Sequence, residues 1–198
     1  YQQRPTPQEG GMFKRQWFEI VDDYPKACRK VRRWDLAASQ QKGDWTSGLL
    51  LGEWQGIFYV IDLQHVRENP AGVEALVRQT AEGDGISTMI RMEQEPGSSG
   101  VNTIDNYARR ILFGYTFKGV PSTGPKEVRA QPVSAAAEAG NIKIVKGAWN
   151  AAFLDEVTLF PNGDHDDIVD VLSGAFTDLT LRTGGHIRAT GRTIGART

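Results

Sequence analysis

The chain has 198 residues, 39% hydrophobic and 24% charged, a composition typical of a globular domain with one core. Its formal net charge of −1 excludes binding to nucleic acid through overall charge, so any such surface must be local. Cys28 is the only cysteine, which excludes an intrachain disulfide and a cysteine-based zinc site, and no apolar run is long enough to cross a membrane. A reducing, cytosolic compartment fits best.

Residues 1–28 are rich in Pro, Gln and Gly and then in aromatic residues, a composition that predicts a linker remnant. They contain neither an initiator Met nor the charged and apolar regions of a signal peptide, which favours a fragment excised from a longer protein. We expect them to pack on the following domain or to have joined it to another one.

Three apolar runs follow, at 30–38, 46–54 and 57–67. They are separated by short glycine-containing segments, and this spacing predicts three adjacent antiparallel strands. The segment 69–85 opens with Asn-Pro, places apolar residues at helical spacing and ends at Gly, so it predicts a helix.

A short strand is predicted at 86–95, running into the turn Pro-Gly-Ser-Ser-Gly, and a helix over 101–114. Pro, Gly and basic residues between 119 and 137 predict a mobile loop with a short helix. A further strand and two late helices are predicted at 142–147, 148–161 and 165–179. This order of elements predicts an α/β fold with a mixed sheet.

Acidic residues stand at places where a carboxylate is unusual. Asp35 interrupts an apolar strand and points away from the face of its two neighbours, although Asp is unfavourable in strands. Glu93 and Glu95 share one face of a later strand, and Glu95 lies at its end beside the glycine turn, where sites collect in such sheets.

A second group of acids, Asp166, Asp167 and Asp170, has the spacing of one helix face. Clustered carboxylates are the oxygen ligands that Mg²⁺ or Mn²⁺ requires. Two such ions about 4 Å apart activate a water and stabilise the departing oxygen in phosphodiester cleavage. The alternative is that each acid is a solvated surface group.

Five motifs occur in order between Arg32 and Phe176: RRWDLAAS, KGDWTSG, MEQEPGSSG, STGPKEVRAQPVSAAAEAGNI and FPNGDHDDIVDVLSGAF. Their succession resembles the C-terminal nuclease domain of tailed-bacteriophage terminase large subunits. The resemblance implies an RNase H-like fold, a central mixed β-sheet flanked by helices on both faces. It also implies a metal-dependent endodeoxyribonuclease that cuts concatemeric viral DNA by two-metal hydrolysis with little sequence specificity.

Carried onto this sequence, the resemblance implies that Asp35, Glu95 and Asp167 are the catalytic metal ligands. Glu93 is the competing choice for Glu95, with a solvated strand position as its alternative role. Asp166 or Asp170 could share or replace the role of Asp167. The implied cofactor is a pair of Mg²⁺ or Mn²⁺ ions.

Four further residues receive expected roles. Lys126 and Arg129 lie in a loop that resembles the DNA-facing segment of the family and would contact phosphates, unless they are solvated loop charges. His165 would orient a phosphate or a water, or else cap the helix that follows it. Asp44 is expected to be structural, in a hairpin turn.

The predicted organisation is a linker remnant at 1–28, a nuclease domain at 29–178 and a flexible basic tail at 179–198. Full-length members of the family carry an N-terminal ATPase, but this sequence has no G-x-x-x-x-G-K-[ST] loop, so we expect no ATP hydrolysis. The expected partners are double-stranded DNA, the portal protein, the small terminase subunit and the ATPase domain of the same protein, in the host-cell cytoplasm and without a membrane.

Two alternatives stay open. One is another RNase H-like nuclease, such as a Holliday-junction resolvase or an integrase core, against which the MEQEPGSSG turn argues. The other is a catalytically idle module that docks on the portal and grips DNA by charge, against which the intact acids argue.

Overall fold

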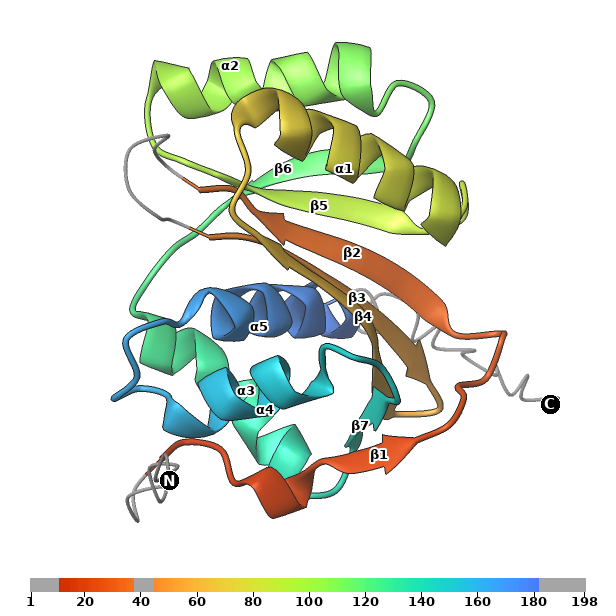
Figure 1. Cartoon of the computed structure of the whole chain (residues 1–198), viewed down its shortest axis with the longest axis vertical. Helices are drawn as coiled ribbons and strands as arrows, with labels where there is room; N and C mark the ends of the chain where they lie inside the picture. The colour runs from red at the N-terminus through yellow and green to blue at the C-terminus, as the bar shows by residue number, and fades with distance from the viewer. Residues whose placement is uncertain (1–10, 38–44, 182–198) are drawn as a thin grey trace, which may run out of the picture.

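A seven-stranded mixed sheet, in the order β1-β7-β4-β3-β2-β5-β6, forms the centre of the molecule. The structure is a computed structural model that describes residues 11–37 and 45–181, so Asp44 and most of the predicted tail lie outside the described residues. Helices α1 and α2 cover one face of the sheet, and α3, α4 and α5 cover the other (Figure 1). The predicted mixed sheet with helices on both faces is confirmed.

The strands are β1 (Glu19–Val21), β2 (Arg29–Asp35), β3 (Thr46–Trp54), β4 (Ile57–Val66), β5 (Met89–Gln94), β6 (Phe117–Pro121) and β7 (Ile142–Val145). The helices are α1 (Pro70–Asp84), α2 (Ser98–Asn106), α3 (Lys126–Glu138), α4 (Asn150–Leu159) and α5 (Asp167–Thr180). Two short helices of other types are the 3-10 helix η1 (Arg15–Trp17) and the π-helix η2 (Tyr107–Ile111). No helix in the described ranges is long and apolar enough to cross a membrane.

The three predicted antiparallel strands are confirmed as β2, β3 and β4. The remaining pairs, β2 with β5, β5 with β6, β4 with β7 and β1 with β7, are parallel. Helix α1 begins where predicted, because the Asn69 side chain accepts a hydrogen bond from the backbone N–H of Gly72 and Pro70 suits the first helical position.

The glycine-rich turn after β5 is tighter than predicted, and α2 begins inside it at Ser98. Gly97 has a φ of +90°, a conformation that favours glycine. A Cβ on Gly100 would lie 2.0 Å from the carbonyl oxygen of Glu95, so only glycine lets the first turn of α2 approach the end of β5. The helix therefore starts before its predicted position at residue 101.

Two strands were not predicted. β1 has three residues, and β6 ends at Pro121, in a region predicted as a mobile loop. Both are edge strands that pair on one side only, so they need little of the continuous apolar pattern that marks a central strand. The rest of the predicted loop is mostly α3, in which burial of Ala130 and Val133 offsets the cost of Pro132.

Two hydrophobic cores lie on the two faces of the sheet. The larger one joins the sheet to α3, α4 and α5, and the smaller one joins it to α1 and η2. Phe13 and Phe18 belong to the larger core, with 2% and 7% of their surface exposed. The described part of residues 1–28 therefore packs on the domain, one of the two placements expected for it.

A buried arginine links strand β2 to the helix α1 that covers one face of the sheet. Arg32 is 1% exposed and makes two hydrogen bonds to the Asp84 carboxylate, of 2.7 and 2.8 Å. Its Nη1 lies 2.8 Å from Asp62 Oδ2 and donates to the carbonyl of Gly48. A charge this deep is tolerated only because its donors are paired.

We predict that Arg32→Met lowers the free energy of unfolding by about 3–5 kcal/mol, because Asp84 would keep a buried charge without its partner. Urea denaturation measures this change. Lys26→Met, which breaks the exposed pair with Asp23, is the control and should leave the denaturation midpoint nearly unchanged. Equal effects of the two substitutions would contradict the structural role of Arg32.

Candidate active site

Four polar side chains lie side by side across the sheet, at the level where β2 ends. The pairing of β2 with β3 places Asp35 opposite Ser47, and the pairing of β3 with β4 places Ser47 opposite His65. The parallel register of β2 and β5 brings Glu93 beside Asp35 on the other side. Opposed residues of neighbouring strands point to the same face, so these four side chains form one row.

The first turn of α5 brings further carboxylates to this row. α5 packs across β2 and β3, and Asp167 and Asp170 lie in its first turn, with Asp166 just before it. Asp170 is only 6% exposed. The positive end of the helix dipole favours negative charge at this position.

Glu156 of α4 completes the junction between the helix and the sheet. Its Oε1 accepts a hydrogen bond of 2.6 Å from the backbone N–H of Ile168 and so caps α5. The Asp166 side chain makes no capping bond. The expected capping role of His165 is therefore filled by a residue from another helix. His165 lies near Asp167 and His65.

The acids disfavour one another's ionised forms. Burial and then repulsion from Glu93, Asp170 and Asp167 raise the pKa of Asp35 to about 7. Burial and then repulsion from the three acids at the start of α5 raise the pKa of Glu156 to about 7. A bound divalent cation would relieve this repulsion between the acids.

Two cations partly neutralise the cluster. Lys126 Nζ lies 2.6 Å from Asp166 Oδ1 and 2.7 Å from Asp170 Oδ2, and Arg129 donates to Asp170 Oδ1 at 2.8 Å. Burial lowers the pKa of Lys126, but its hydrogen bonds to Asp166 and Asp170 and their negative charge outweigh burial and raise that pKa. The loop predicted for Lys126 and Arg129 is wrong: both lie at the start of α3, and both are counter-ions of the acids rather than solvated loop charges.

Glu95 and Glu93 differ in their placement. Glu93 is a half-buried residue of β5 in the polar row, whereas Glu95 is exposed and follows the end of the strand. Sequence alternation assigned both residues to one face, but the strand ends at Gln94 and the backbone then turns into α2. Position beside Asp35 therefore favours Glu93 over Glu95 as its partner.

The donor set fits a hard divalent cation in its chemistry. The possible ligands are carboxylate oxygens from two strands and one helix, and Mg²⁺ and Mn²⁺ prefer such oxygen ligands. The ammonium group of Lys126 already bridges two of these acids. Within the described ranges, no three acidic or histidine side chains converge on one point in this arrangement. A shared ion would require side-chain rotation in the cluster.

The sequence did not indicate His65 as part of the site. Its Nδ1 lies 2.7 Å from Ser47 Oγ, and its Nε2 lies 4.0 Å from Glu156 Oε2. Burial and then repulsion from His165 and Arg67 lower the pKa of His65 to about 4, so the ring is neutral at pH 7. Alternation along β4 could have assigned its face, but only the strand register could place it beside Ser47.

Comparison with known proteins shows the relationship of this chain. The family model of the terminase RNaseH-like domain matches residues 32–179. The zinc-bound large terminase nuclease of thermophilic phage G20c is 18% identical, with a TM-score of 0.64 over 84% of this chain and 97% of that chain. The P22 large terminase nuclease domain is 13% identical, with a TM-score of 0.62 over 89% and 95%.

A large terminase from another thermophilic bacteriophage is also similar, at 12% identity and a TM-score of 0.58. That match covers 86% of this chain and 44% of the longer terminase chain. The search of curated protein sequences gave no significant match. At these identities the solved structures show a shared fold, which is RNase H-like, as predicted.

We predict that the metal-free protein loses stability as pH rises from about 4 to about 7, because native Asp35 retains a proton that the unfolded chain has already released. Asp35→Asn should remove part of this dependence and raise the unfolding midpoint at pH 8 by on the order of 5 °C. Thermal unfolding in EDTA between pH 4 and 8 measures both effects.

The control is Asp22→Asn, which changes an exposed carboxylate outside the cluster. It should leave the pH profile of the parent unchanged. A profile for Asp35→Asn that coincides with that of Asp22→Asn would show that Asp35 does not carry the predicted proton.

Proposed function

This chain belongs to the terminase RNaseH-like domain family, and we propose that it is the metal-dependent endonuclease of a phage DNA-packaging terminase. The observation that supports this proposal most strongly is the meeting of Asp35 and Glu93 with the acids of α5. Three separate elements supply carboxylates to one place, which is the arrangement required for metal-assisted phosphodiester hydrolysis. The proposed substrate is double-stranded concatemeric viral DNA, cut with little sequence preference.

The proposed cofactor is a pair of Mg²⁺ or Mn²⁺ ions. The G20c large terminase nuclease has been solved with bound zinc, magnesium and cobalt, which supports a divalent-cation site in this fold. When bound, the ions would activate a water and stabilise the departing oxygen. We assign their ligands to Asp35, Glu93 and Asp167, with Asp166 as a further ligand.

Glu95 was the first choice from the sequence, and its exposed position beyond the strand leaves Glu93 as the better assignment. Asp170 is assigned an anchoring role, because both of its carboxylate oxygens already accept from Lys126 and Arg129. Each acid is held by a sheet strand or a helix terminus that is packed on the core. Such rigid support keeps the ligands in place for catalysis.

Lys126 and Arg129 take different parts in this proposal. Lys126 has 42% of its side chain exposed, and an ammonium group carries three donors, so it has a third donor for a DNA phosphate beyond Asp166 and Asp170. Arg129 is less exposed and fixes Asp170. His165, beside Asp167, remains the proposed residue for orienting a phosphate or water.

We further propose that the domain, whose core includes Phe13, Phe18 and Leu179 besides the predicted range 29–178, acts as the nuclease domain of a longer packaging protein in the host-cell cytoplasm. The match to a bacteriophage large terminase of more than twice the matched length supports this organisation. Its proposed partners are the ATPase domain of the same protein, the portal protein and the small terminase subunit. The predicted boundaries at 28 and 179 are too narrow, because β1 pairs within the sheet and Leu179 of α5 is buried in the larger core.

We predict that the protein nicks supercoiled plasmid in Mn²⁺ or Mg²⁺ but not in EDTA. Asp35→Asn should reduce the rate by more than about 100-fold, since even outer-shell changes at metal sites cost 10–100-fold. Thermal unfolding of the variant checks that the loss does not reflect misfolding.

Metal-dependent nicking that survives in Asp35→Asn would contradict the assignment of Asp35. No cleavage in any metal, together with no Mn²⁺ binding by calorimetry, would favour the idle DNA-gripping module. Preferential cleavage of four-way junctions over linear duplex would favour the resolvase-like alternative.

A matched pair of substitutions tests the second ligand. We predict that Glu93→Gln weakens Mn²⁺ binding and nicking by about 10-fold or more, whereas Glu95→Gln leaves both near the parental values. The two changes remove the same charge from neighbouring positions of the chain, one inside β5 and one beyond its end. Isothermal titration with Mn²⁺ measures affinity without catalysis, and the reverse result would restore Glu95 as the ligand.

A further inference from the structure

A stack of three side chains stands beside the acids and has no part in the proposed metal chemistry. The ring centroids of Trp45 and His65 are 4.0 Å apart with planes inclined by 13°, and Cζ of Arg67 lies 4.2 Å from the centroid of Trp45. Two groups this close to one centroid cannot share a face of the indole. Trp45 therefore lies between His65 and Arg67.

The stack is fixed from within the sheet. His65 is held by Ser47, which is fully buried, and lies near Glu156. Trp45 and Arg67 lie just outside β3 and β4, and their contacts place them, since Trp45 stacks on His65 of the polar row and Arg67 stacks on Trp45.

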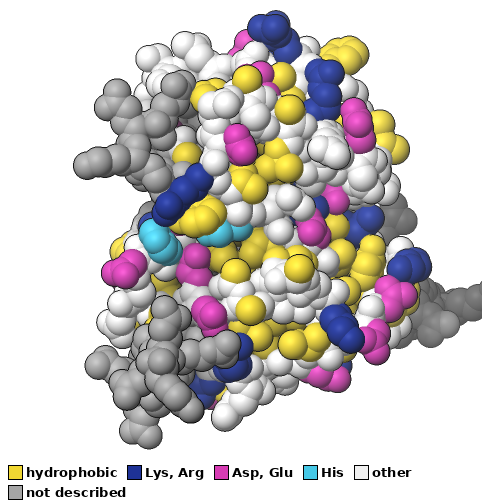
Figure 2. Space-filling model, viewed as in Figure 1, with side chains coloured by type: hydrophobic (Ala, Val, Ile, Leu, Met, Phe, Trp, Pro, Cys, Tyr) yellow, Lys and Arg dark blue, Asp and Glu magenta, His cyan; other side chains and the backbone are white. Residues whose placement is uncertain are grey.

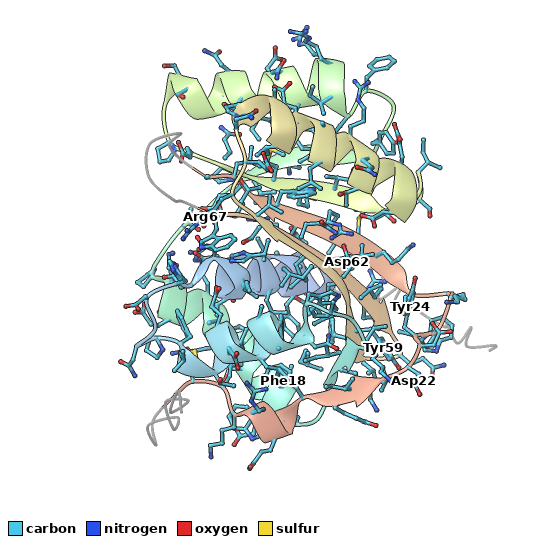
Figure 3. The ribbon with its side chains drawn as sticks, in the orientation of Figure 1. Phe18, Asp22, Tyr24, Tyr59, Asp62 and Arg67 are labelled. Atoms are coloured by element: carbon cyan, nitrogen blue, oxygen red, sulfur yellow. The ribbon has the colours of Figure 1, made fainter. Side chains whose placement is uncertain are left out.

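The outer end of the stack is an exposed cation. Arg67 is exposed, and none of the acidic side chains within the described residues forms an ion pair with it. Figure 3 places it where β4 leads into α1, and Figure 2 shows basic, histidine and acidic side chains grouped along the same side of the molecule. Its guanidinium is thus oriented by packing without being neutralised.

The distance from the acids suits a polymeric substrate. Arg67 follows β4, and Asp35 is the last residue of β2. These strands are two positions apart in the sheet, so their separation across the sheet is about 10 Å at a strand spacing of about 4.8 Å. Nucleotides rise about 3.4 Å each along one strand of duplex DNA. Arg67 therefore lies within a few nucleotides of a phosphodiester bound at the acids.

We propose that Arg67, held by Trp45 on His65, forms a subsite for a backbone phosphate of the DNA strand and positions that strand for cleavage. This inference rests on the proposed nuclease function. Stacking uses the flat face of the guanidinium and leaves its edge donors for two parallel hydrogen bonds to phosphate oxygens. Such a contact positions the strand and reads no base.

The test measures binding of a fluorescent DNA duplex by anisotropy as a function of salt concentration in the presence of Mg²⁺. All proteins carry the background substitution Asp35→Asn, which prevents cleavage of the duplex. Arg67→Gln should weaken binding about tenfold and reduce the slope of log K against log salt by about 0.9, the value for one lost phosphate contact. Arg67→Lys keeps the charge, so it should preserve the slope while lowering affinity. Trp45→Leu should lower affinity with Arg67 still present.

Arg78→Gln is the matched control, because Arg78 is an exposed arginine of α1 on the opposite face of the sheet. It should leave affinity and slope unchanged, and unfolding midpoints should show that all variants are folded. If the background protein binds DNA but Arg67→Gln behaves like Arg78→Gln, the subsite is overturned alone. If the background protein binds no DNA at any salt concentration, the proposed nuclease function is overturned and the subsite with it.

Discussion

The structure depends on holding like charges together between the central strands and the start of α5. Asp35 on β2 faces Glu93 on β5 and the acids at the start of α5, and their repulsion opposes folding whenever they are ionised. Neighbouring parts of the molecule reduce this cost. Lys126 and Arg129 pair with the helix acids, and the dipole of α5 adds its positive end.

Strand β2 is fixed on both faces, and this keeps Asp35 in place. Arg32 reaches Asp84 and Asp62 on the side of α1, while Arg33 reaches Asp178 of α5 on the other side. Alternation along the strand makes this possible, because consecutive arginines point in opposite directions. The two hydrophobic cores then bury the strand from both faces, so a destabilising charge cluster sits on a well-supported element.

One face of the sheet thus carries two groups of polar side chains in a line. The acids occupy the end near β5, and the stack of His65, Trp45 and Arg67 occupies the end near β4, with Ser47 between them. Strands β2 and β4, which lead to the acids and to the cation, are two strand spacings apart, about 10 Å across the sheet. Under the proposed nuclease function, this order would hold a DNA strand beside the carboxylate cluster.

The sequence by itself determined the features that neighbouring residues encode. Alternation indicated the strands β2, β3 and β4 and set Asp35 apart as an acid within an apolar strand, and helical spacing grouped Asp167 with Asp170. The tertiary structure alone decided that Glu93 lies beside Asp35, that Lys126 pairs with the helix acids, and that His65, Trp45 and Arg67 form one stack. The physical reason is that the period of a strand or helix is local, whereas strand register and helix docking bring together segments that are distant in the chain.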